Sequence, residues 1–467
     1  MKRNILFLVL AVLWTFGITA NAQGNSITYL VLAKGQSSLP QDLDAMVAER
    51  GGVIQSRIPQ VGIAVVNSSN PDFMGAMAGV RSIKAVIPNF TIQMPDVAYE
   101  PLTGNPPDSG DDDFYFDLQW GHDAVNAPEA WDAGVRGAGV RVAVLDTGTD
   151  RTHPDIAPNF NGDLSTSFLQ APFGPLPENW HFHGTHTAGT IAAADNAFGT
   201  IGVAPDAEIF GVQVCGNGGC PAYALVAGIV YAADNGADLI NMSLGGFDLL
   251  SNKGFMKFCT KELGLPAPVC ATAQPSYIHN EILVMQRAFQ YANQQGTTTV
   301  VSAGNSAADG DHDVVGGVHY PSLRFSFADY PGTIAVSATA PIGWCLDSST
   351  DLNVLADYSN FGRSVIDFSA PGGNGWFFEG DDTICWPGVP AWVLDLVFST
   401  TPGGWSWAGG TSMAAPHVTG IAALIISENG GPMKPSQVLS ELRNRAEDLG
   451  APGQDPEHGN GGVRSGY

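Results

Sequence analysis

The sequence has little positive charge, a single long apolar run, and no cysteine pair at metal-ligand spacing. Its 20 Lys and Arg stand against 45 Asp and Glu, for a formal net charge of −25. A nucleic-acid-binding protein needs a basic face to neutralise phosphates, so we expect no nucleic-acid partner. The single apolar run excludes a multi-span membrane protein. The acidic surface mainly favours solubility, and its carboxylates suit hard cations such as calcium.

The N-terminal segment is typical of a secretory signal peptide. Two basic residues precede an apolar stretch over residues 5–16, and a cleavage site of small residues ends at Ala22. We therefore expect residues 1–22 to be removed and the protein to be secreted, with no membrane partner. An uncleaved membrane anchor is the alternative, but the apolar run is short for a membrane span.

The six cysteines all lie beyond this segment. An even number of cysteines in an exported chain indicates disulfides, and pairing in chain order is the simplest arrangement. That order predicts the pairs Cys215–Cys220, Cys259–Cys270 and Cys345–Cys385. A zinc site is the alternative, and neither a CxxC pair nor a histidine at ligand spacing supports it.

Two further regions precede the main part of the chain. Residues 23–94 carry strand and helix patterns in the order βαββαβ, which is typical of a small ferredoxin-like α+β domain. Residues 95–113 are rich in proline, glycine and acid and show no periodicity. We expect this stretch to be an exposed linker that is easily cut.

Residues 114–467 alternate apolar strands with helices. Segments such as GVRVAVLDTG and ADLINMSLGG have almost no polar interior, and helical stretches such as ALVAGIVYAADNG separate them. This pattern predicts an α/β domain with a parallel sheet covered on both faces. Residues 247–276 interrupt the order without a clear period, and we interpret them as a surface insertion.

Three segments place reactive side chains at the ends of predicted elements. Asp146 ends a buried strand, His183 precedes a helix of small residues, and Ser412 opens an alanine-rich helix. Each alone fits a turn, a structural histidine or a helix cap. Together they supply a nucleophile, a base to activate it, and an acid to orient the base. Their chain order is that of subtilisin, whereas an α/β-hydrolase lipase, the alternative, has its serine first, in G-x-S-x-G.

The segments HGTHTAGT and GTSMAAPH, with VAVLDTGTD before them, closely resemble the signatures of subtilisin-like serine peptidases over residues 114–460. The resemblance implies a subtilisin-like three-layer domain and a secreted endopeptidase acting on protein or peptide substrates. It makes Asp146 the residue that orients the base, His183 the general base and acid, and Ser412 the nucleophile, and it leaves His186 without a catalytic role. A catalytically dead binding protein on this scaffold would be expected to lack one of these residues.

The same resemblance implies further site residues. Asn305, in an AGN turn, would donate a hydrogen bond to the oxyanion. Ser243, Leu244 and Gly245 would form the wall against which substrate binds as an extended strand. His319 would lie near the base of the first specificity pocket, although an exposed loop histidine is the simpler interpretation.

A calcium site is implied by the loop that follows the HGTH helix. By position, its ligands would be the Asp155 carboxylate, the Asn196 side chain, the carbonyls of Ala194, Phe198 and Thr200, and Asp112 or Asp113. Oxygen ligands of this mixture suit calcium. A second acidic loop, with Asp309, Asp311 and Asp313, is better interpreted as solvated.

The N-terminal domain resembles the inhibitory propeptide of these enzymes. Such a domain packs on the catalytic domain and sends its C-terminal tail through the substrate cleft. The resemblance therefore predicts an intramolecular inhibitor, released by cleavage within residues 95–113. We expect the released enzyme to be a monomer, with no further binding domain after the closing turn at the C-terminus.

Overall fold

The computed structural model describes residues 26–94, 98–101, 112–169, 181–217, 219–261, 276–374, 384–386 and 389–467. The predicted signal peptide and Cys270, and with Cys270 its predicted bond to Cys259, lie outside these residues. Within the described ranges, no helix combines the length and the apolar character needed to cross a membrane.

The N-terminal module is a four-stranded antiparallel sheet in the order β2-β3-β1-β4, with two helices. This confirms the predicted βαββαβ order. Its core includes residues from both helices and from β1, β3 and β4. The elements are β1 (Ile27–Ala33), α2 (Leu43–Glu49), β2 (Gly52–Ile58), β3 (Ile63–Ser68), α3 (Phe73–Ala78) and β4 (Ile83–Pro88).

The large domain is built on an eight-stranded sheet, which confirms the predicted α/β fold. Its strand order is β18-β17-β13-β11-β7-β9-β8, with β19 paired to β17. All pairs are parallel except that of β17 with β18. The strands are β7 (Arg141–Asp146), β8 (Thr166–Ser167), β9 (Glu208–Gln213), β11 (Leu239–Met242), β13 (Thr298–Ser302), β17 (Thr333–Ala340), β18 (Val354–Leu355) and β19 (Phe368–Pro371).

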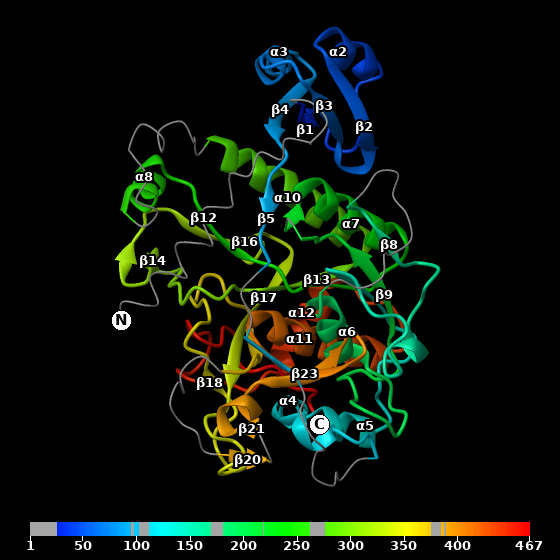
Figure 1. The fold of residues 1–467 in the computed structure, drawn as a ribbon, viewed down its shortest axis with the longest axis vertical. Coiled ribbons are helices and arrows are strands. Elements are labelled where there is room, and N and C mark those ends of the chain that lie inside the picture. The colour runs from blue at the N-terminus through cyan, green and yellow to red at the C-terminus, as the bar shows by residue number, and fades with distance from the viewer. Residues whose placement is uncertain are drawn as a thin grey trace.

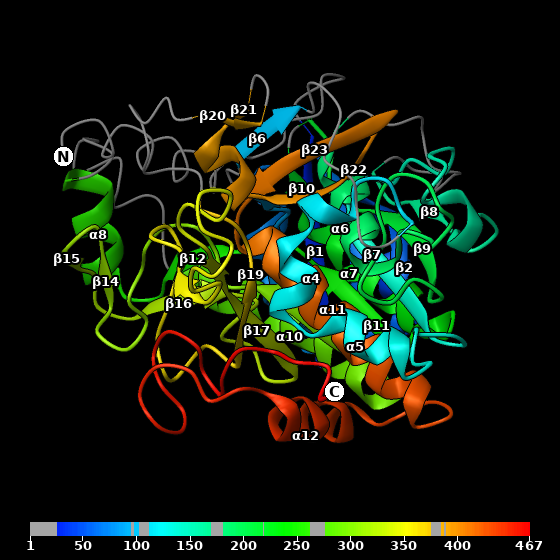
Figure 2. The ribbon, with the colours of Figure 1, turned by 90° about the horizontal axis from the view of Figure 1, so that it is seen from below.

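Helices cover both faces of this sheet, which is why its strands are apolar on both sides. Along β7, Val142 and Val144 belong to one core, and Ala143 and Leu145 belong to the other. The core that contains Val142 and Val144 also includes residues of α5, α6, α11 and α12. The core that contains Ala143 and Leu145 includes residues of α7 and α10 (Figures 1 and 2). The helices are α4 (Trp120–Ala124), α5 (Ala127–Asp132), α6 (His183–Ala192), α7 (Ala222–Asp234), α10 (Ser276–Gln295), α11 (Thr411–Glu428) and α12 (Pro435–Arg445).

The N-terminal module rests on the face formed by α7 and α10 (Figure 1). Arg287 of α10 is buried there, and its guanidinium donates to the carbonyls of Val61 (3.2 Å) and Ala33 (3.0 Å). On the same face, the Gln60 amide donates to Asp234 Oδ2 of α7 at 2.9 Å. The module therefore contacts the large domain in two ways. The end of β1 and the connection between β2 and β3 form polar contacts, and apolar side chains of the sheet pack on the helices.

Two stretches expected to lack regular structure contain strands. The predicted linker includes β6 (Ala98–Pro101), and the predicted insertion includes β12 (Gly246–Leu249) and α8 (Asn252–Lys261). β6 pairs with β23, and β12 pairs with β16. These strands form through backbone hydrogen bonds, although the stretches that contain them show no clear period of apolar and polar side chains. The remaining strands are β5 (Thr91–Ile92), β10 (Cys220–Pro221), β14 (Val314–Val315), β15 (Val318–His319), β16 (Leu323–Ser326), β20 (Ile384–Trp386), β21 (Val389–Pro390), β22 (Val397–Thr401) and β23 (Gly404–Gly409).

Two of the predicted disulfides are present. Cys215 is bonded to Cys220, and Cys345 is bonded to Cys385. The first closes a short loop at the end of β9, and the second lies in a separate apolar cluster beside β22 and β23. Pairing in chain order is thus confirmed for the four cysteines that the structure describes in full.

Candidate active site

Asp146 and His183 are joined by a buried hydrogen bond. Asp146 is the last residue of β7, and His183 is the first residue of α6. Nδ1 of His183 lies 2.8 Å from Oδ1 and 2.9 Å from Oδ2 of Asp146. The Thr147 backbone N–H also donates to Asp146 Oδ1, at 2.6 Å. The carboxylate therefore fixes the imidazole so that Nε2 faces away from Asp146.

The start of α6 is held unusually close to the end of β7. A Cβ on Gly184 would lie 2.2 Å from the Gly148 carbonyl oxygen and 3.1 Å from Asp146 Cβ. The Gly184 backbone N–H donates to Thr147 Oγ1 at 3.0 Å. A glycine after His183 therefore lets the helix approach the strand closely enough for the two catalytic candidates to meet.

His186 has a structural environment, as expected. Its ring is buried, and Nε2 lies 3.2 Å from the Val397 carbonyl oxygen. Burial lowers the pKa of His186 to about 3, with the nearby His183 a smaller contribution. The ring therefore stays neutral at neutral pH.

Ser412 is the second residue of α11, which packs against α6 (Figure 1). Its hydroxyl donates to the Ser243 carbonyl oxygen at 3.1 Å, and Ser243 Oγ donates to the Ser412 carbonyl oxygen at 2.7 Å. Nε2 of His183 is buried without a hydrogen-bond partner among the described residues. The serine hydroxyl thus points to the Ser243 carbonyl oxygen in this conformation, and a rotation about its Cα–Cβ bond redirects it.

A chain of buried side chains holds Ser243 in place. Thr419 Oγ1 donates to Asn241 Oδ1 at 2.9 Å, and Asn241 Nδ2 donates to Ser243 Oγ at 3.1 Å. Because Thr419 lies on α11 as well, the hydrogen bonds tie β11, which Ser243 directly follows, to the helix that carries Ser412. Sequence reasoning did not find Asn241 or Thr419, since nothing in their local patterns distinguishes them from ordinary core polar residues.

Asn305 follows β13 and lies beside the start of α11. Its Oδ1 accepts hydrogen bonds from the Thr411 backbone N–H (2.9 Å) and from Thr411 Oγ1 (2.7 Å). Because the amide oxygen faces Thr411, the amide NH₂ group faces the opposite side. That orientation suits a donor to an oxyanion. No local sequence pattern identifies Thr411 as the residue that anchors the amide.

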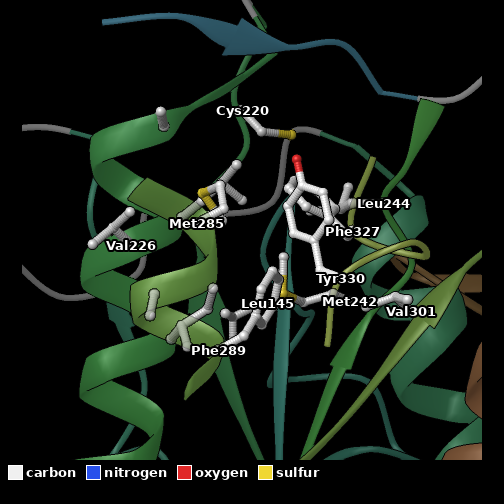
Figure 3. Close-up of a cluster of buried hydrophobic side chains, with 14 of the residues drawn as sticks. Leu145, Cys220, Val226, Met242, Leu244, Met285, Phe289, Val301, Phe327 and Tyr330 are labelled. Atoms are coloured by element: carbon white, nitrogen blue, oxygen red, sulfur yellow. The ribbon is translucent and has the colours of Figure 1, made fainter. Parts of the chain in front are cut away.

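The three predicted wall residues are buried, and Ser243 is the one that exchanges hydrogen bonds with Ser412. A Cβ on Gly245 would lie 2.8 Å from the Ser302 carbonyl oxygen, so the backbone packs closely there. Leu244 belongs to a large apolar cluster, where Figure 3 shows it near Phe327 and Tyr330, below Cys220.

The comparison with known families agrees with this geometry. A family model described as the subtilase family matches residues 137–461, which is more than half of the chain. The chain belongs to the subtilase family. Subtilisin Savinase from Lederbergia lenta is 33% identical over 336 residues, covering 72% of this chain and 93% of that protein. Membership makes this chain a subtilisin-type serine endopeptidase.

Other relatives are matched over less of their length, and one comparison concerns the fold alone. M-protease from Shouchella clausii is 33% identical over 335 residues, which cover 71% of this chain and 66% of that protein. The crystal structure of the epidermin leader peptide processing serine protease of Staphylococcus aureus matches with a TM-score of 0.71 at 20% identity. That match covers 94% of this chain and 97% of the other, and it shows a shared fold.

In this subtilase, the segment after the N-terminal module pairs with both sides of the site. β5 is antiparallel to β10, where Ile92 faces Cys220, and β6 is antiparallel to β23, where Ala98 faces Gly409. β23 ends just before Ser412 in the sequence. Phe90, Ile92 and Met94 pack against the cluster that contains Leu244. The segment therefore pairs with β10 beside the Leu244 cluster and with β23 just before Ser412.

The predicted calcium loop wraps around two aspartates. Asp155 Oδ2 accepts hydrogen bonds from the Thr200 backbone N–H (2.8 Å) and Trp405 Nε1 (2.8 Å), whereas its Oδ1 is buried without a partner in the described chain. Asp113 Oδ1 accepts from the backbone N–H groups of Phe198 (3.2 Å) and Asn196 (3.4 Å).

The acidic residues of this loop region form one cluster. Carboxylate oxygens of Asp112, Asp113 and Asp195 all lie within 4.8 Å of one another. Asp113 is buried and Asp112 is exposed, so of the two candidates Asp113 is the one directed into the loop. Ala194 lies in the same loop, and its backbone N–H donates to the Asp155 carbonyl oxygen at 2.8 Å.

The other predicted positions have simpler environments. His319 is exposed in β15, and its carbonyl oxygen accepts a hydrogen bond from Lys257 Nζ at 2.7 Å. The carboxylates of the second acidic loop are engaged by different backbone segments. Asp311 accepts from Arg363 N at 2.8 Å, and Asp313 accepts from Ser322 N at 2.9 Å. These carboxylates therefore fasten the loop to its neighbours.

Proposed function

We propose that this subtilase is secreted as an inactive precursor and hydrolyses proteins through Asp146, His183 and Ser412, acting as a monomer. The buried Asp146–His183 hydrogen bond carries the proposal, because it holds Nδ1 and leaves Nε2 to act as the base. Ser412 sits at the N-terminus of an 18-residue helix, where the helix dipole favours negative charge. Each reactive group thus has the environment that its role requires.

The reaction is acyl transfer to Ser412. His183 Nε2 removes the hydroxyl proton as Oγ attacks the substrate carbonyl, and the oxyanion is stabilised by the Asn305 amide and the Ser412 backbone N–H. His183 then gives the proton to the leaving amine, and water hydrolyses the acyl-enzyme by the same steps. Asp146 stabilises the imidazolium that forms between these transfers.

Extended substrates bind by adding a strand. Ser243, Leu244 and Gly245 form one wall, and β10 forms the other, where β5 of the precursor now pairs. The residues beyond the cut would pair with β23, as β6 does. Because the chain's own segment follows both pairings, we infer that it occupies the substrate site and inhibits the precursor.

The first cut would then fall between Met94 and Ala98. Met94 follows the segment that pairs with β10, and Ala98 opens the segment that pairs with β23. A bond that crosses Ser412 must lie between the two pairings. This refines the predicted region of 95–113 to its first residues, and residues up to 94 would remain bound as the inhibitor until they are degraded.

We also propose a structural calcium ion in the 194–200 loop. The unpartnered Asp155 Oδ1, buried beside an acidic cluster, is the kind of group that a cation satisfies. Asp155, Asp113 and Asn196 would hold the ion through their side chains, together with the carbonyls of Ala194, Phe198 and Thr200. Bound calcium would lock the loop against the segment around Asp113, and it takes no part in peptide hydrolysis.

The serine mechanism is tested by covalent labelling. A fluorophosphonate reacts only with an activated serine, so the mature enzyme should be labelled at Ser412, as located by peptide mass mapping. The His183→Ala variant should fold and lose the label, whereas His319→Ala should keep it. Equal labelling of the His183→Ala variant, or labelling at another serine, would contradict the proposed roles.

A further inference from the structure

The Cys215–Cys220 disulfide joins the catalytic aspartate to the strand on which the inhibitory segment lies. The Cys215 backbone N–H donates to the carbonyl oxygen of Asp146 at 3.1 Å, so this end of the disulfide is anchored at the end of β7. Cys220 begins β10 and faces Ile92 in the antiparallel pairing with β5. The two cysteines are five positions apart in the sequence and are joined by the disulfide bond.

The Cys220 end is in direct contact with the segment in the cleft. Its Sγ lies 3.7 Å from Met94 Sδ. Gly219, at φ +91°, lies so close to the segment that a Cβ there would be 2.6 Å from the Ile92 carbonyl oxygen. Figure 3 shows Cys220 at the top of the apolar cluster, between Leu244 and Tyr330 below and the β5 strand above. This end of the disulfide is therefore part of the surface that binds an extended chain.

β10 is fixed at its C-terminal end, where it runs directly into the buried helix α7, and its N-terminal end is joined to a flexible loop. It is two residues long, and the loop before it is rich in glycine, which gives the backbone wide conformational freedom. Within the loop, Gly216 and Gly219 exchange two backbone hydrogen bonds of 3.0 and 2.8 Å. The Ala222 backbone N–H donates to Phe90 O, a contact that is lost when the inhibitory segment leaves. After maturation, α7 still holds the C-terminal end of β10, and the disulfide ties its N-terminal end to Cys215 beside Asp146.

We propose that Cys215–Cys220 is a positioning element for extended substrates, and this rests on the proposed function. The disulfide holds β10 ready to pair with substrate residues several positions before the cut. A short substrate does not reach β10, so its hydrolysis does not depend on the bond. The closed loop is short, and the stabilisation a disulfide gives the whole fold grows with loop length, so its main effect is local.

The test compares two double variants of the mature enzyme on two substrates. Cys215→Ser/Cys220→Ser removes the proposed element, and Cys345→Ser/Cys385→Ser removes a disulfide that packs beside β22 and β23, away from β10. The substrates are chromogenic anilides that share the residue before the cut and carry one or six residues upstream. The readout is the ratio of kcat/KM for the long substrate to kcat/KM for the short one, in which the folded fraction of each preparation cancels.

We expect Cys215→Ser/Cys220→Ser to lower this ratio about tenfold, mainly through KM, because one or two backbone hydrogen bonds to substrate are weakened. Cys345→Ser/Cys385→Ser should leave the ratio within about twofold of the wild-type value. If the first variant cannot be produced, the same ratio is measured on wild-type enzyme after phosphine reduction, with alkylation mapped by mass spectrometry.

An unchanged ratio in the enzyme that lacks the Cys215–Cys220 bond would overturn the inference. So would an equal fall in both double variants, because that indicates a general loss of structure. A wild-type enzyme that cleaves neither substrate nor casein would instead count against the proposed function, which separates the two failures.

Discussion

Gly184→Ala tests whether the close contact between α6 and β7 sets the geometry of the catalytic pair. Helix propensity alone predicts that alanine in this helix stabilises the protein by about 1 kcal/mol. The structure predicts the opposite for activity, because the new Cβ would lie 2.2 Å from the Gly148 carbonyl oxygen. Real Cβ atoms stay at least 3.0 Å from such neighbours, so the helix start or the strand end must move by 3.0 − 2.2 = 0.8 Å.

That displacement changes the geometry of the Asp146–His183 hydrogen bond. Asp146 Cβ and Oδ1 lie 3.1 and 3.2 Å from the same Cβ position, so the helix cannot relieve the clash by sliding toward them. The Nδ1–Oδ1 distance of 2.8 Å lengthens or bends as a result. A misplacement of about 1 Å in an active site costs about 10²-fold in rate, so we expect kcat to fall about 10²-fold with KM little changed.

The assay is hydrolysis of a chromogenic peptide by mature enzyme, with thermal unfolding measured on the same samples. Gly162→Ala is the matched control, because Gly162 is exposed and a Cβ there meets nothing within 4 Å. This variant should keep kcat within about twofold of the wild-type value. A folded Gly184→Ala enzyme with wild-type kcat would refute the reasoning, because the pair would then tolerate the displacement.

Three further predictions concern other parts of the site and the fold. Asn305→Asp keeps the acceptor for Thr411 and loses the donor, so kcat at pH 8 should fall at least about 10²-fold; a change under fivefold would remove Asn305 from the oxyanion site. Burial, with Asp248 nearby, raises the pKa of Glu281 to about 8, so stability present at low pH is lost as pH rises toward 8. In the inactive Ser412→Ala chain, calorimetry should show Glu281→Gln gaining Tm over its parent as pH rises from 5 to 9, and a constant difference would contradict the burial. Calcium should raise the Tm of the same chain, since a ligand at about 100 times its Kd adds about 2.7 kcal/mol; Asp155→Asn should abolish that rise, and an undiminished rise would place the ion elsewhere.

The central strands were predictable because both faces of the sheet are buried. In β7, Val142 and Leu145 face opposite cores, so the sequence has no polar alternation there and reads as an unbroken apolar run. Asp146, His183 and Ser412 could be identified from the sequence for a different reason. Each lies in a motif of small residues at the end of a strand or at the start of a helix. The helices and disulfides that surround them follow from local periodicity and from cysteine order.

Contacts between distant backbones were not predictable. β6 lies within a proline-rich and glycine-rich stretch, and it forms a strand because its backbone groups meet the edge of β23. Thr411 and Asn305 are 106 residues apart, and neither carries a local sign of the hydrogen bonds that orient the amide. The choice between Asp112 and Asp113 likewise depends on which side chain the fold turns into the 194–200 loop.

The most direct test of the account is N-terminal mass mapping of the secreted protein, wild type beside Ser412→Ala, with casein hydrolysis measured on both. We predict that wild-type enzyme begins between residues 95 and 98 and digests casein. The Ser412→Ala protein should begin at residue 23, keep the N-terminal module and be inactive. If both proteins are cut at the same place and neither digests casein, maturation is external and the proposed self-processing serine peptidase is contradicted.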